Sequence, residues 1–404
     1  MAGNIPQFYL RLGIPADKPF FEENKDLYYG VLVNARILES FPKSTAAFLN
    51  DLSKPFIIDP DTYAFKLDPS MLKRERDFQI KRSYSELEKF YNSIITQCFK
   101  EDRPIYPADF LGSNGNTDVK KLDEFSSKVI AYEKTRIDSL IGGLLRFMVE
   151  TNAHPYVLMA PYFDSSSIVD PWYKISLELA KVSTKFKEKY QLYPVICIEK
   201  SFLANEANIA HLVKDYDFSG FDGYFIWLPD FNEDSENLVL LSGYAKLVKN
   251  LSKYGKPIIG MYGKFFSALL SYNGMTGFSS GINYWDKRSL EIAGGGPPYP
   301  RYYVPFLHTF LPWENVARLF SEDPSLVCRC PACKQALSGG QPSMNDIKTH
   351  FLYARFQELG DVASKKKNTI VRELLADYSK KKPLLEPLIQ LDHLERWGKV
   401  IATI

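Results

Sequence analysis

The feature that most constrains the fold is a regular alternation of short apolar runs and helix-length segments between residues 155 and 282. Each run has the near-continuous apolar character of a strand that is covered on both faces, and the intervening segments repeat apolar residues at helical spacing. Repeated units of this length predict parallel strands joined by right-handed crossovers. The five runs are residues 155–160, 194–199, 223–228, 257–262 and 277–282.

Three further apolar runs bring the number of predicted strands to eight. They are residues 8–12, 28–34 and 56–60. Eight parallel strands with helices between them favour an α/β fold of the (β/α)8 TIM-barrel type. An open, doubly wound sheet is the alternative, but no G-x-G-x-x-G motif follows any of these runs.

Changes in this pattern also predict the domain organisation. Residues 1–310 are expected to form the barrel, with a helical insertion at about 70–152 that is longer than one crossover helix. Residues 311–404 are expected to form a zinc-binding and C-terminal helical module.

The composition is that of a globular protein that buries a substantial core. The chain has 404 residues, of which 45% are hydrophobic and 24% charged, and it has a formal net charge of +2. It contains no apolar run of about 18 residues, and its N-terminus lacks the pattern of a signal peptide, so we expect a cytoplasmic protein without membrane contact. Basic clusters at 73–76 and 365–367 either contact phosphates or form solvated helix faces.

Three cysteines and one histidine have the spacing of a metal site. Cys328, Cys330 and Cys333 lie within six positions, and His350 follows on a predicted helix. Zn²⁺ is usually held by four sulfur or nitrogen ligands, and four protein ligands leave no open position, so a structural zinc ion is expected. Free core thiols and disulfides are the alternatives, but charged neighbours argue against the first and an odd number of cysteines against the second.

Acidic residues follow several of the predicted strands. Asp59, Asp164, Glu199 and Asp230 lie at or just beyond strand ends, and Asp286 lies a few residues past the last strand. In a barrel of this type the carboxyl ends of the strands carry the active site, so these acids are candidate catalytic residues. The alternative is that each caps the helix that follows it.

A barrel followed by C-x-C-x-x-C and a helix-borne histidine resembles the tRNA-guanine transglycosylase family, including relatives that insert 7-deazaguanine bases into DNA. The resemblance covers about residues 54 to 360. The run Lys54–Asp59 resembles the strand whose terminal aspartate is the family's general acid/base, and Phe163-Asp164 resembles the family's pair that reads the guanine edge. Glu199 stands where the family has a base-binding glutamine.

The resemblance implies exchange of guanine for a 7-deazaguanine base in DNA or tRNA through a covalent glycosyl-aspartate intermediate, which is a pentosyltransferase reaction. The family's nucleophile is on a strand that here reads Gly277-Phe278-Ser279-Ser280, without an acid. Asp286 is therefore the first candidate nucleophile and Asp230 the second, with Asp59 as acid/base. The expected base-binding residues are Asp164, Glu199, Tyr63, Trp227 and Tyr262, of which the last three would stack on the base.

Two other functions remain open. One is a catalytically silent transglycosylase-like subunit that binds nucleic acid or a protein partner. The other is an unrelated zinc-containing barrel hydrolase or lyase. The expected partners are thus DNA or tRNA and a 7-deazaguanine base, with either a second copy of the chain or another subunit.

Overall fold

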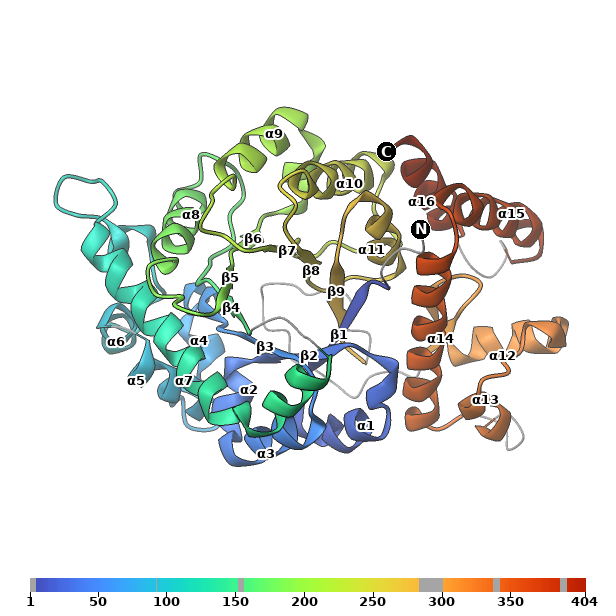
Figure 1. Ribbon diagram of the computed structural model, residues 1–404, viewed down its shortest axis with the longest axis horizontal. Helices are drawn as coiled ribbons and strands as arrows, with labels where there is room; N and C mark the ends of the chain where they lie inside the picture. The colour runs from blue at the N-terminus through green and yellow to red at the C-terminus, as the bar shows by residue number, and fades with distance from the viewer. Residues whose placement is uncertain (1–4, 92, 152–155, 283–300, 337–341, 386–390) are drawn as a thin grey trace.

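The computed structural model describes residues 5–91, 93–151, 156–282, 301–336, 342–385 and 391–404. Its centre is a curled, parallel sheet of seven strands in the order β3-β2-β1-β9-β8-β7-β6 (Figure 1). The strands are β1 (Gln7–Leu12), β2 (Gly30–Asn34), β3 (Phe56–Asp59), β6 (Val195–Cys197), β7 (Tyr224–Trp227), β8 (Ile258–Gly260) and β9 (Gly277–Ser280). The predicted α/β fold with a parallel sheet is confirmed, and the N-terminal run forms β1, which pairs with both β2 and β9.

A second parallel pair lies between the two edges of this sheet. It consists of β4 (Val157–Met159) and β5 (Gln191–Tyr193), and only Pro194 separates β5 from β6. At the β3 edge of the sheet, the hydroxyl of Thr62, which follows β3, donates to the Tyr162 carbonyl at 2.7 Å and accepts from the Tyr162 N–H at 2.9 Å. These contacts connect the segment after β3 to the segment after β4.

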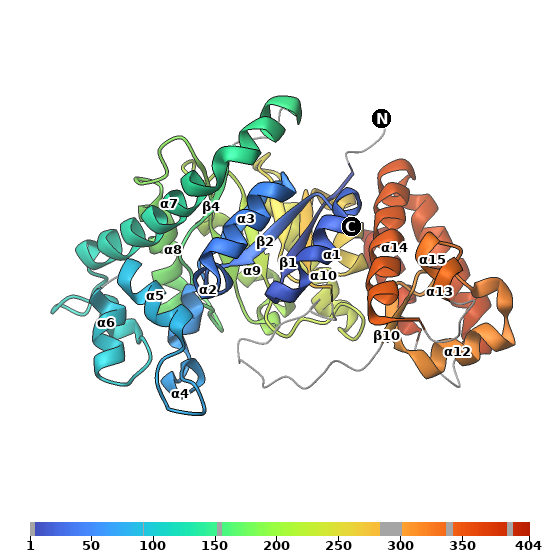
Figure 2. The same cartoon turned by 90° about the horizontal axis from the view of Figure 1, so that it is seen from below.

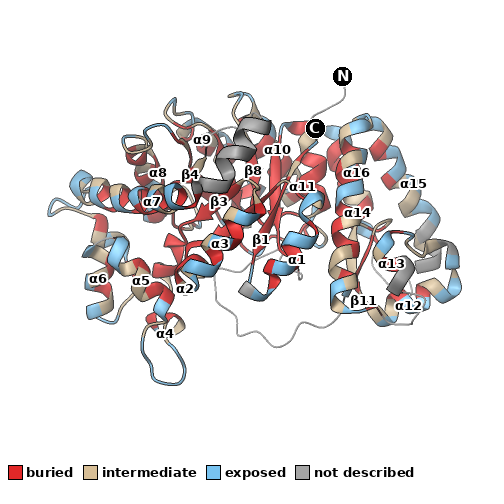
Figure 3. Cartoon of the chain, turned by 60° about the horizontal axis from the view of Figure 1, so that its bottom comes forward, coloured by how far each residue is buried: buried red, intermediate tan, exposed pale blue. Residues whose placement is uncertain are grey.

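Helices cover the outer face of the sheet (Figure 1). The strands are buried almost throughout, so their outward side chains need this cover. Figure 3 shows the same arrangement, with the buried residues concentrated on the strands and on the inner sides of the helices. The helices are α1 (Lys18–Glu23), α2 (Ala35–Ser40), α3 (Pro42–Leu52), α8 (Pro171–Ser183), α9 (Glu206–Asp215), α10 (Leu238–Ser252) and α11 (Phe265–Leu269).

The segment between β3 and β4 contains α4 (Pro69–Leu72), α5 (Arg82–Phe90), α6 (Ser93–Lys100) and α7 (Val119–Thr151). Among the helices of this segment, only α7 is long. Before it, an antiparallel bridge between Lys73 and Ile80 encloses a turn in which Phe78 has φ 54°, and the chain therefore leaves the helical conformation.

The inner face of the sheet is filled by large side chains. They form one cluster: Tyr9, Leu32, Ile57, Tyr63, Met159, Tyr162, Tyr193, Val195, Cys197, Phe225, Trp227, Ile259, Met261 and Tyr262. Successive strand residues point to opposite faces, and alternate residues of β1, β2, β3, β6, β7 and β8 therefore contribute to it.

The C-terminal part of the chain packs beside the sheet (Figure 2). It comprises the antiparallel hairpin β10 (Arg301–Val304) and β11 (Thr309–Pro312), followed by α12 (Trp313–Glu322), α13 (Pro331–Ala336), α14 (Met344–Ser364), α15 (Lys367–Leu385) and α16 (Asp392–Thr403). Phe351 of α14 contacts Phe8 of β1, with ring centroids 6.4 Å apart. Among the described residues, no helix has both the length and the apolar character needed to cross a membrane.

Candidate functional site

The three cysteines and the histidine lie together. The ligand atoms of Cys328, Cys330, Cys333 and His350 all lie within 4.8 Å of one another. The His350 Nδ1 atom is 3.5 Å from the Cys330 sulfur and 3.3 Å from the Cys333 sulfur. Tetrahedral zinc with ordinary Zn–S and Zn–N bonds places such atoms about 3.5 Å apart, so this Cys3His cluster fits a metal ion of that kind.

Neighbouring residues orient the histidine ligand. His350 lies on α14, which begins after Ser343 with a capping box formed by Ser343 and Asp346. The Nε2 atom of His350 is 2.7 Å from the Tyr303 carbonyl oxygen. A carbonyl accepts only, so Nε2 carries the proton and Nδ1 presents its lone pair to the three sulfurs. The ring of Tyr302 stacks on the imidazole at 4.1 Å and covers the cluster.

A second group of polar residues lies at the carboxyl ends of β1, β2 and β3. This strand-end cluster consists of Arg11, Asn34, Asp59, Asp61 and Tyr162, and all five are buried. It is centred on Asp59, which accepts hydrogen bonds from the Arg11 guanidinium at 3.1 Å, the Tyr162 hydroxyl at 2.9 Å, the Asn34 amide at 3.3 Å and the Asp61 N–H at 3.0 Å.

The charge state of Asp59 depends on opposing effects. Burial raises the pKa of its carboxyl, and the neighbouring Asp61 carboxylate raises it further. The Arg11 guanidinium lowers this pKa, but the net direction is upward. The Asn34 amide donates to both aspartates, at 3.3 Å to Asp59 and 3.0 Å to Asp61, so the two carboxyls lie on either side of one amide nitrogen. Asp61 also forms an ion pair with Arg36.

Three aromatic side chains, Tyr63, Trp227 and Tyr262, adjoin the strand-end cluster. We refer to them as the aromatic wall. The rings of Tyr63 and Trp227 are 4.7 Å apart, and those of Trp227 and Tyr262 are 5.5 Å apart. The Arg11 guanidinium carbon lies 4.0 Å from the centroid of the Tyr262 ring. Tyr262 has φ 60°, an uncommon backbone conformation for a residue with a bulky side chain.

Arg11 and Trp227 each carry a donor atom that has no acceptor among the described residues. Arg11 Nη1 and Trp227 Nε1 are buried and make no hydrogen bond to any described residue. Both side chains are at least nine-tenths buried, at 5% and 0% exposure. Buried polar atoms are nearly always paired, so these two need an explanation.

The other predicted site residues lie elsewhere. Asp164 forms an ion pair with Lys66 at 2.7 Å and is partly buried. Glu199 and Asp230 follow β6 and β7 as predicted, but both are exposed and neither has a described contact with the strand-end cluster. Asp286 lies outside the described residues, and its predicted role is not addressed by the structure.

The basic clusters have acidic partners close by. Lys73 pairs with Asp102, and Arg74 with Asp77 at 3.0 Å. Lys365 pairs with Asp361 at 3.1 Å and with Glu373 at 2.9 Å. These pairs are those expected of solvated helix and loop surfaces.

Sequence reasoning missed Arg11, Asn34, Asp61 and Tyr162. One signal was available, since Arg11 is a charged residue within the otherwise apolar run of β1 and must find a buried partner there. That partner is Asp59, and the two residues meet because only β2 lies between β1 and β3 in the sheet.

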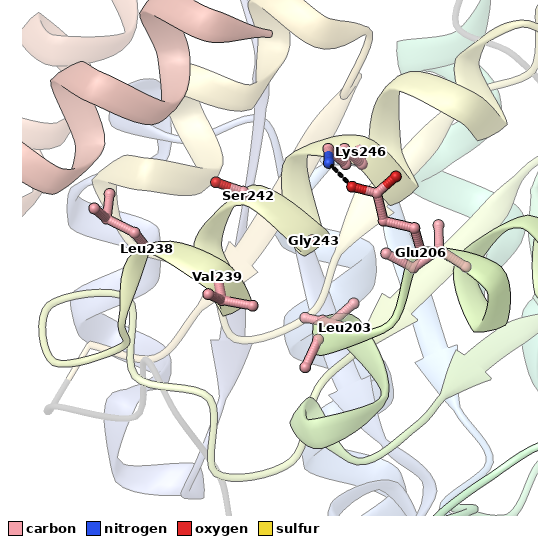
Figure 4. A pocket seen from close by; sticks show the side chains of 9 residues that line it. Leu203, Glu206, Leu238, Val239, Ser242, Gly243 and Lys246 are labelled. Atoms are coloured by element: carbon pink, nitrogen blue, oxygen red, sulfur yellow. Dashed lines mark hydrogen bonds and ion pairs between the residues drawn. The ribbon is translucent and has the colours of Figure 1, made fainter.

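A groove lies on the outer surface between α9, α10 and the turn at Lys200–Ala204 (Figure 4). Its volume is about 270 Å³, and an ion pair between Glu206 and Lys246 closes one side. Figure 4 shows Leu203, Leu238 and Val239 around the groove. The close approach of α10 to the turn at Lys200–Ala204 requires Gly243, because a Cβ there would meet the Leu203 carbonyl oxygen at 2.1 Å.

Comparisons with known proteins identify no family. No family model and no curated protein matches the chain. Among solved structures, an intracellular xylanase from Thermoanaerobacterium saccharolyticum is similar at 6% identity with a TM-score of 0.40, covering 74% of this chain and 91% of the xylanase. A GH10 endoxylanase from a sugarcane soil metagenome is similar at 11% identity with a TM-score of 0.33, covering 65% of this chain and 72% of the endoxylanase.

The prediction of a nucleic-acid base-exchange transglycosylase is wrong, because the similar solved structures are xylanases. The pentosyltransferase reaction and the nucleic-acid modification that were predicted with it are therefore not supported. The site gives a physical reason. In β9, where the resemblance places the nucleophile, Ser279 and Ser280 are buried and carry no carboxylate. The predicted partners, DNA or tRNA, a 7-deazaguanine base and a second subunit, stay predictions, as does location in the cytoplasm.

Proposed function

We propose that this chain is a hydrolase that cleaves a glycosidic bond at the carboxyl ends of its strands. The observation that carries the proposal is Asp59, a carboxyl with a raised pKa that lies beside a second carboxyl, Asp61, and next to the aromatic wall. Glycoside hydrolysis needs two carboxyl groups, one of which stays protonated to serve as the acid.

The seven-stranded sheet and the β4–β5 pair together would form a (β/α)8 barrel, with β5 and β6 as one strand interrupted at Pro194. This reading is supported by the hydrogen bonds between Thr62 and Tyr162, which link the segments after β3 and β4. In such barrels the catalytic groups lie at the carboxyl ends of the strands, where the strand-end cluster lies.

The chemistry assigns each carboxyl one role. Asp59 donates its proton to the leaving glycosidic oxygen as the bond to the anomeric carbon breaks. Asp61, which is held by Arg36 and Asn34, attacks that carbon and forms a glycosyl ester, because two carboxyls that accept from one amide nitrogen at 3.3 and 3.0 Å are too close for direct attack by water. A water molecule then hydrolyses the ester and gives its proton to Asp59, which restores both carboxyl groups. The Tyr262 and Trp227 rings would contact the apolar face of the sugar. Both carboxyls are buried, so substrate binding requires that the side chains covering them move aside.

The Cys3His cluster would hold zinc in a structural role. Four protein ligands complete a tetrahedral coordination shell and leave no position for substrate. The cluster joins α13 to α14, and α14 packs on β1 through Phe351. The ion would therefore fix the helix that supports one side of the sheet.

A second candidate is a non-catalytic binding protein. The observation in its favour is that Asp59 already accepts four hydrogen bonds, as a carboxylate with a purely structural role would. Activity measurements separate the two candidates.

The test is hydrolysis of a panel of 4-nitrophenyl glycosides by the full chain and its Asp59→Asn variant. The substitution removes the acid and keeps the shape of the side chain, so kcat should fall by about 100-fold or more. Activity of the unmutated chain should also fall at high pH, where Asp59 loses its proton.

The matched control is Asp123→Asn on α7, because Asp123 pairs with Lys185 on the surface and should leave kcat unchanged. Absence of hydrolysis of every glycoside by the unmutated, metal-loaded chain would favour the non-catalytic candidate. Full activity of the Asp59→Asn variant would remove Asp59 from the mechanism.

A further inference from the structure

Two of the three sulfurs in the Cys3His cluster accept hydrogen bonds from the backbone of the cysteine motif itself. The Cys330 N–H donates to the Cys328 sulfur at 3.4 Å, and the Cys333 N–H donates to the Cys330 sulfur at 3.4 Å. Cysteine binds metal as the thiolate, and such donors stabilise its negative charge. Cys333 lies inside α13, where backbone N–H groups donate to carbonyls of the preceding turn. Its sulfur therefore needs a donor from elsewhere in the chain.

That donor is the hydroxyl of Tyr302 on β10. The Tyr302 oxygen lies 2.9 Å from the Cys333 sulfur and 3.4 Å from His350 Nδ1. The one lone pair of Nδ1 is used for metal binding, whereas a coordinated thiolate sulfur keeps further lone pairs for hydrogen bonds. A tyrosine hydroxyl keeps its proton at neutral pH, so Tyr302 donates and Cys333 accepts.

The surroundings of Tyr302 hold this hydroxyl in place. The residue is 1% exposed, and its ring stacks on the His350 imidazole, with centroids 4.1 Å apart and an interplanar angle of 12°. The rings of Trp313 and Phe320 also pack on it, each at 5.7 Å. A ring packed this closely has few alternative conformations, so directing its hydroxyl at the sulfur costs little conformational entropy when metal binds.

The charge of the cluster shows what this hydrogen bond contributes. Three thiolates and a neutral imidazole outweigh the double positive charge of a zinc ion, so the complex keeps a net negative charge. Cys330, Cys333 and His350 are buried, and part of this charge therefore lies away from solvent. A buried negative charge is stabilised by a donor that points at it, and Tyr302 supplies one without adding a competing ligand.

We propose that the Tyr302 hydroxyl is a positioning group of the metal centre, which donates to the Cys333 thiolate and thereby holds it on the ion. The proposal rests on the structural zinc site proposed above and is independent of the hydrolase. It adds one side-chain hydrogen bond to the two backbone hydrogen bonds that the cysteine motif provides by itself. Loss of this donor should weaken metal binding while all four ligands remain.

The experiment compares Tyr302→Phe with the unmutated full chain. This substitution keeps the ring that stacks on His350 and removes only the hydroxyl. Zinc affinity, measured by competition with a chromophoric chelator, should fall about tenfold or more, as it does when an outer partner of a metal ligand is lost. With cobalt in place of zinc, the sulfur-to-cobalt charge-transfer band should move to longer wavelength, because a thiolate without its donor gives up electrons more easily.

The matched control is Tyr303→Phe, which removes a buried hydroxyl from the neighbouring residue. The Tyr303 hydroxyl donates to Glu358 at 2.7 Å, and the Tyr303 carbonyl that orients His350 is kept in the variant. This variant loses a hydrogen bond and some stability, but its zinc affinity and cobalt band should match those of the unmutated chain.

A double-mutant cycle identifies the acceptor of the hydrogen bond. Cys333→Ala removes the sulfur that accepts from Tyr302, so adding Tyr302→Phe to this variant should change the cobalt affinity by less than about twofold. If the hydroxyl acted through His350 instead, Tyr302→Phe would weaken binding equally with and without Cys333, and the assignment to Cys333 would be wrong.

The results separate the role of Tyr302 from the metal site itself. An unmutated chain that binds neither zinc nor cobalt contradicts the metal site and the role of Tyr302 with it. Metal binding with unchanged affinity and an unchanged cobalt band in Tyr302→Phe contradicts the role of Tyr302 alone. Equal losses of affinity in Tyr302→Phe and Tyr303→Phe would also contradict it, because the effect would then not depend on contact with the cluster.

Discussion

At the scale of single residues, Glu233 shows how burial controls charge. It lies in the loop after β7 and is 2% exposed, and its carboxyl accepts from the Ser267 hydroxyl at 2.5 Å and from the Ser267 N–H at 3.2 Å. Burial raises its pKa from 4.5 to about 7, although the bonds from Ser267 lower it. It lines a small cavity of about 10 Å³ with Tyr262, which is room for one water molecule.

The raised pKa predicts a pH dependence of stability. Between about pH 4.5 and 7 the unfolded chain releases the Glu233 proton while the folded chain keeps it, so the free energy of unfolding falls as pH rises through this window. The full effect is roughly 3 kcal/mol. Glu233→Gln cannot titrate, so in urea unfolding its stability should change less between pH 4.5 and 7 than that of the unmutated chain.

The control for this experiment is Glu206→Gln, because the Glu206 side chain is 78% exposed and pairs with Lys246 on the surface. It should keep the pH dependence of the unmutated chain. Parallel pH profiles for the Glu233→Gln variant and the unmutated chain would show that Glu233 titrates normally in the folded state.

At the scale of elements, the Cys3His cluster determines how α13 meets α14. The short α13 carries Cys333, the turn before it carries Cys328 and Cys330, and α14 carries His350. A metal ion bound by these four residues would link α13 to α14. Because the unfolded chain has no preformed site, metal binding would stabilise the folded chain.

Metal analysis of the purified chain should find one zinc ion per molecule. Cys330→Ser removes one ligand and should lower both the zinc content and the melting temperature, and a chelator should lower the melting temperature of the unmutated chain. Cys98→Ser, at a buried cysteine of α6 outside the cluster, should keep its zinc. An unmutated chain without zinc would contradict the assignment.

At the scale of the whole molecule, α16 joins the C-terminal helices to the body of the sheet. The Trp397 indole N–H donates to the Glu233 carbonyl oxygen at 2.9 Å, and its ring lies 6.1 Å from Phe265 and 6.2 Å from Phe266 of α11. Trp397 is fully buried, so the C-terminal helices and the helices that cover the sheet share a packed interior at this point.

Replacing Trp397 by alanine should lower the free energy of unfolding by about 3 to 5 kcal/mol, because it removes a large buried side chain and leaves a cavity. Urea unfolding followed by fluorescence and circular dichroism measures the change. Phe356→Ala, at a side chain of α14 that is 50% exposed, should change stability by less than about 0.5 kcal/mol. A loss below about 1 kcal/mol for Trp397→Ala would mean that α16 contributes little to cooperative folding.

The sequence by itself determined the features that depend on neighbours along the chain. The apolar runs predicted the strands of the parallel sheet, and the Cys-x-Cys-x-x-Cys spacing with a histidine on the predicted helix after it predicted the Cys3His cluster. Both signals are local, because helical and strand periodicity and ligand spacing are set within a few residues.

Only the tertiary structure decided which polar side chains meet at the strand ends. Arg11 and Asp59 are 48 residues apart and Asp59 and Tyr162 are 103 apart, yet they hydrogen-bond because the curled sheet brings β1 and β3 and the segment after β4 together. Glu199 and Asp230 follow strands as regularly as Asp59 does, but they remain exposed. Position at a strand end is a local property, whereas burial and partners depend on the order and curvature of the sheet, which no short stretch of sequence specifies.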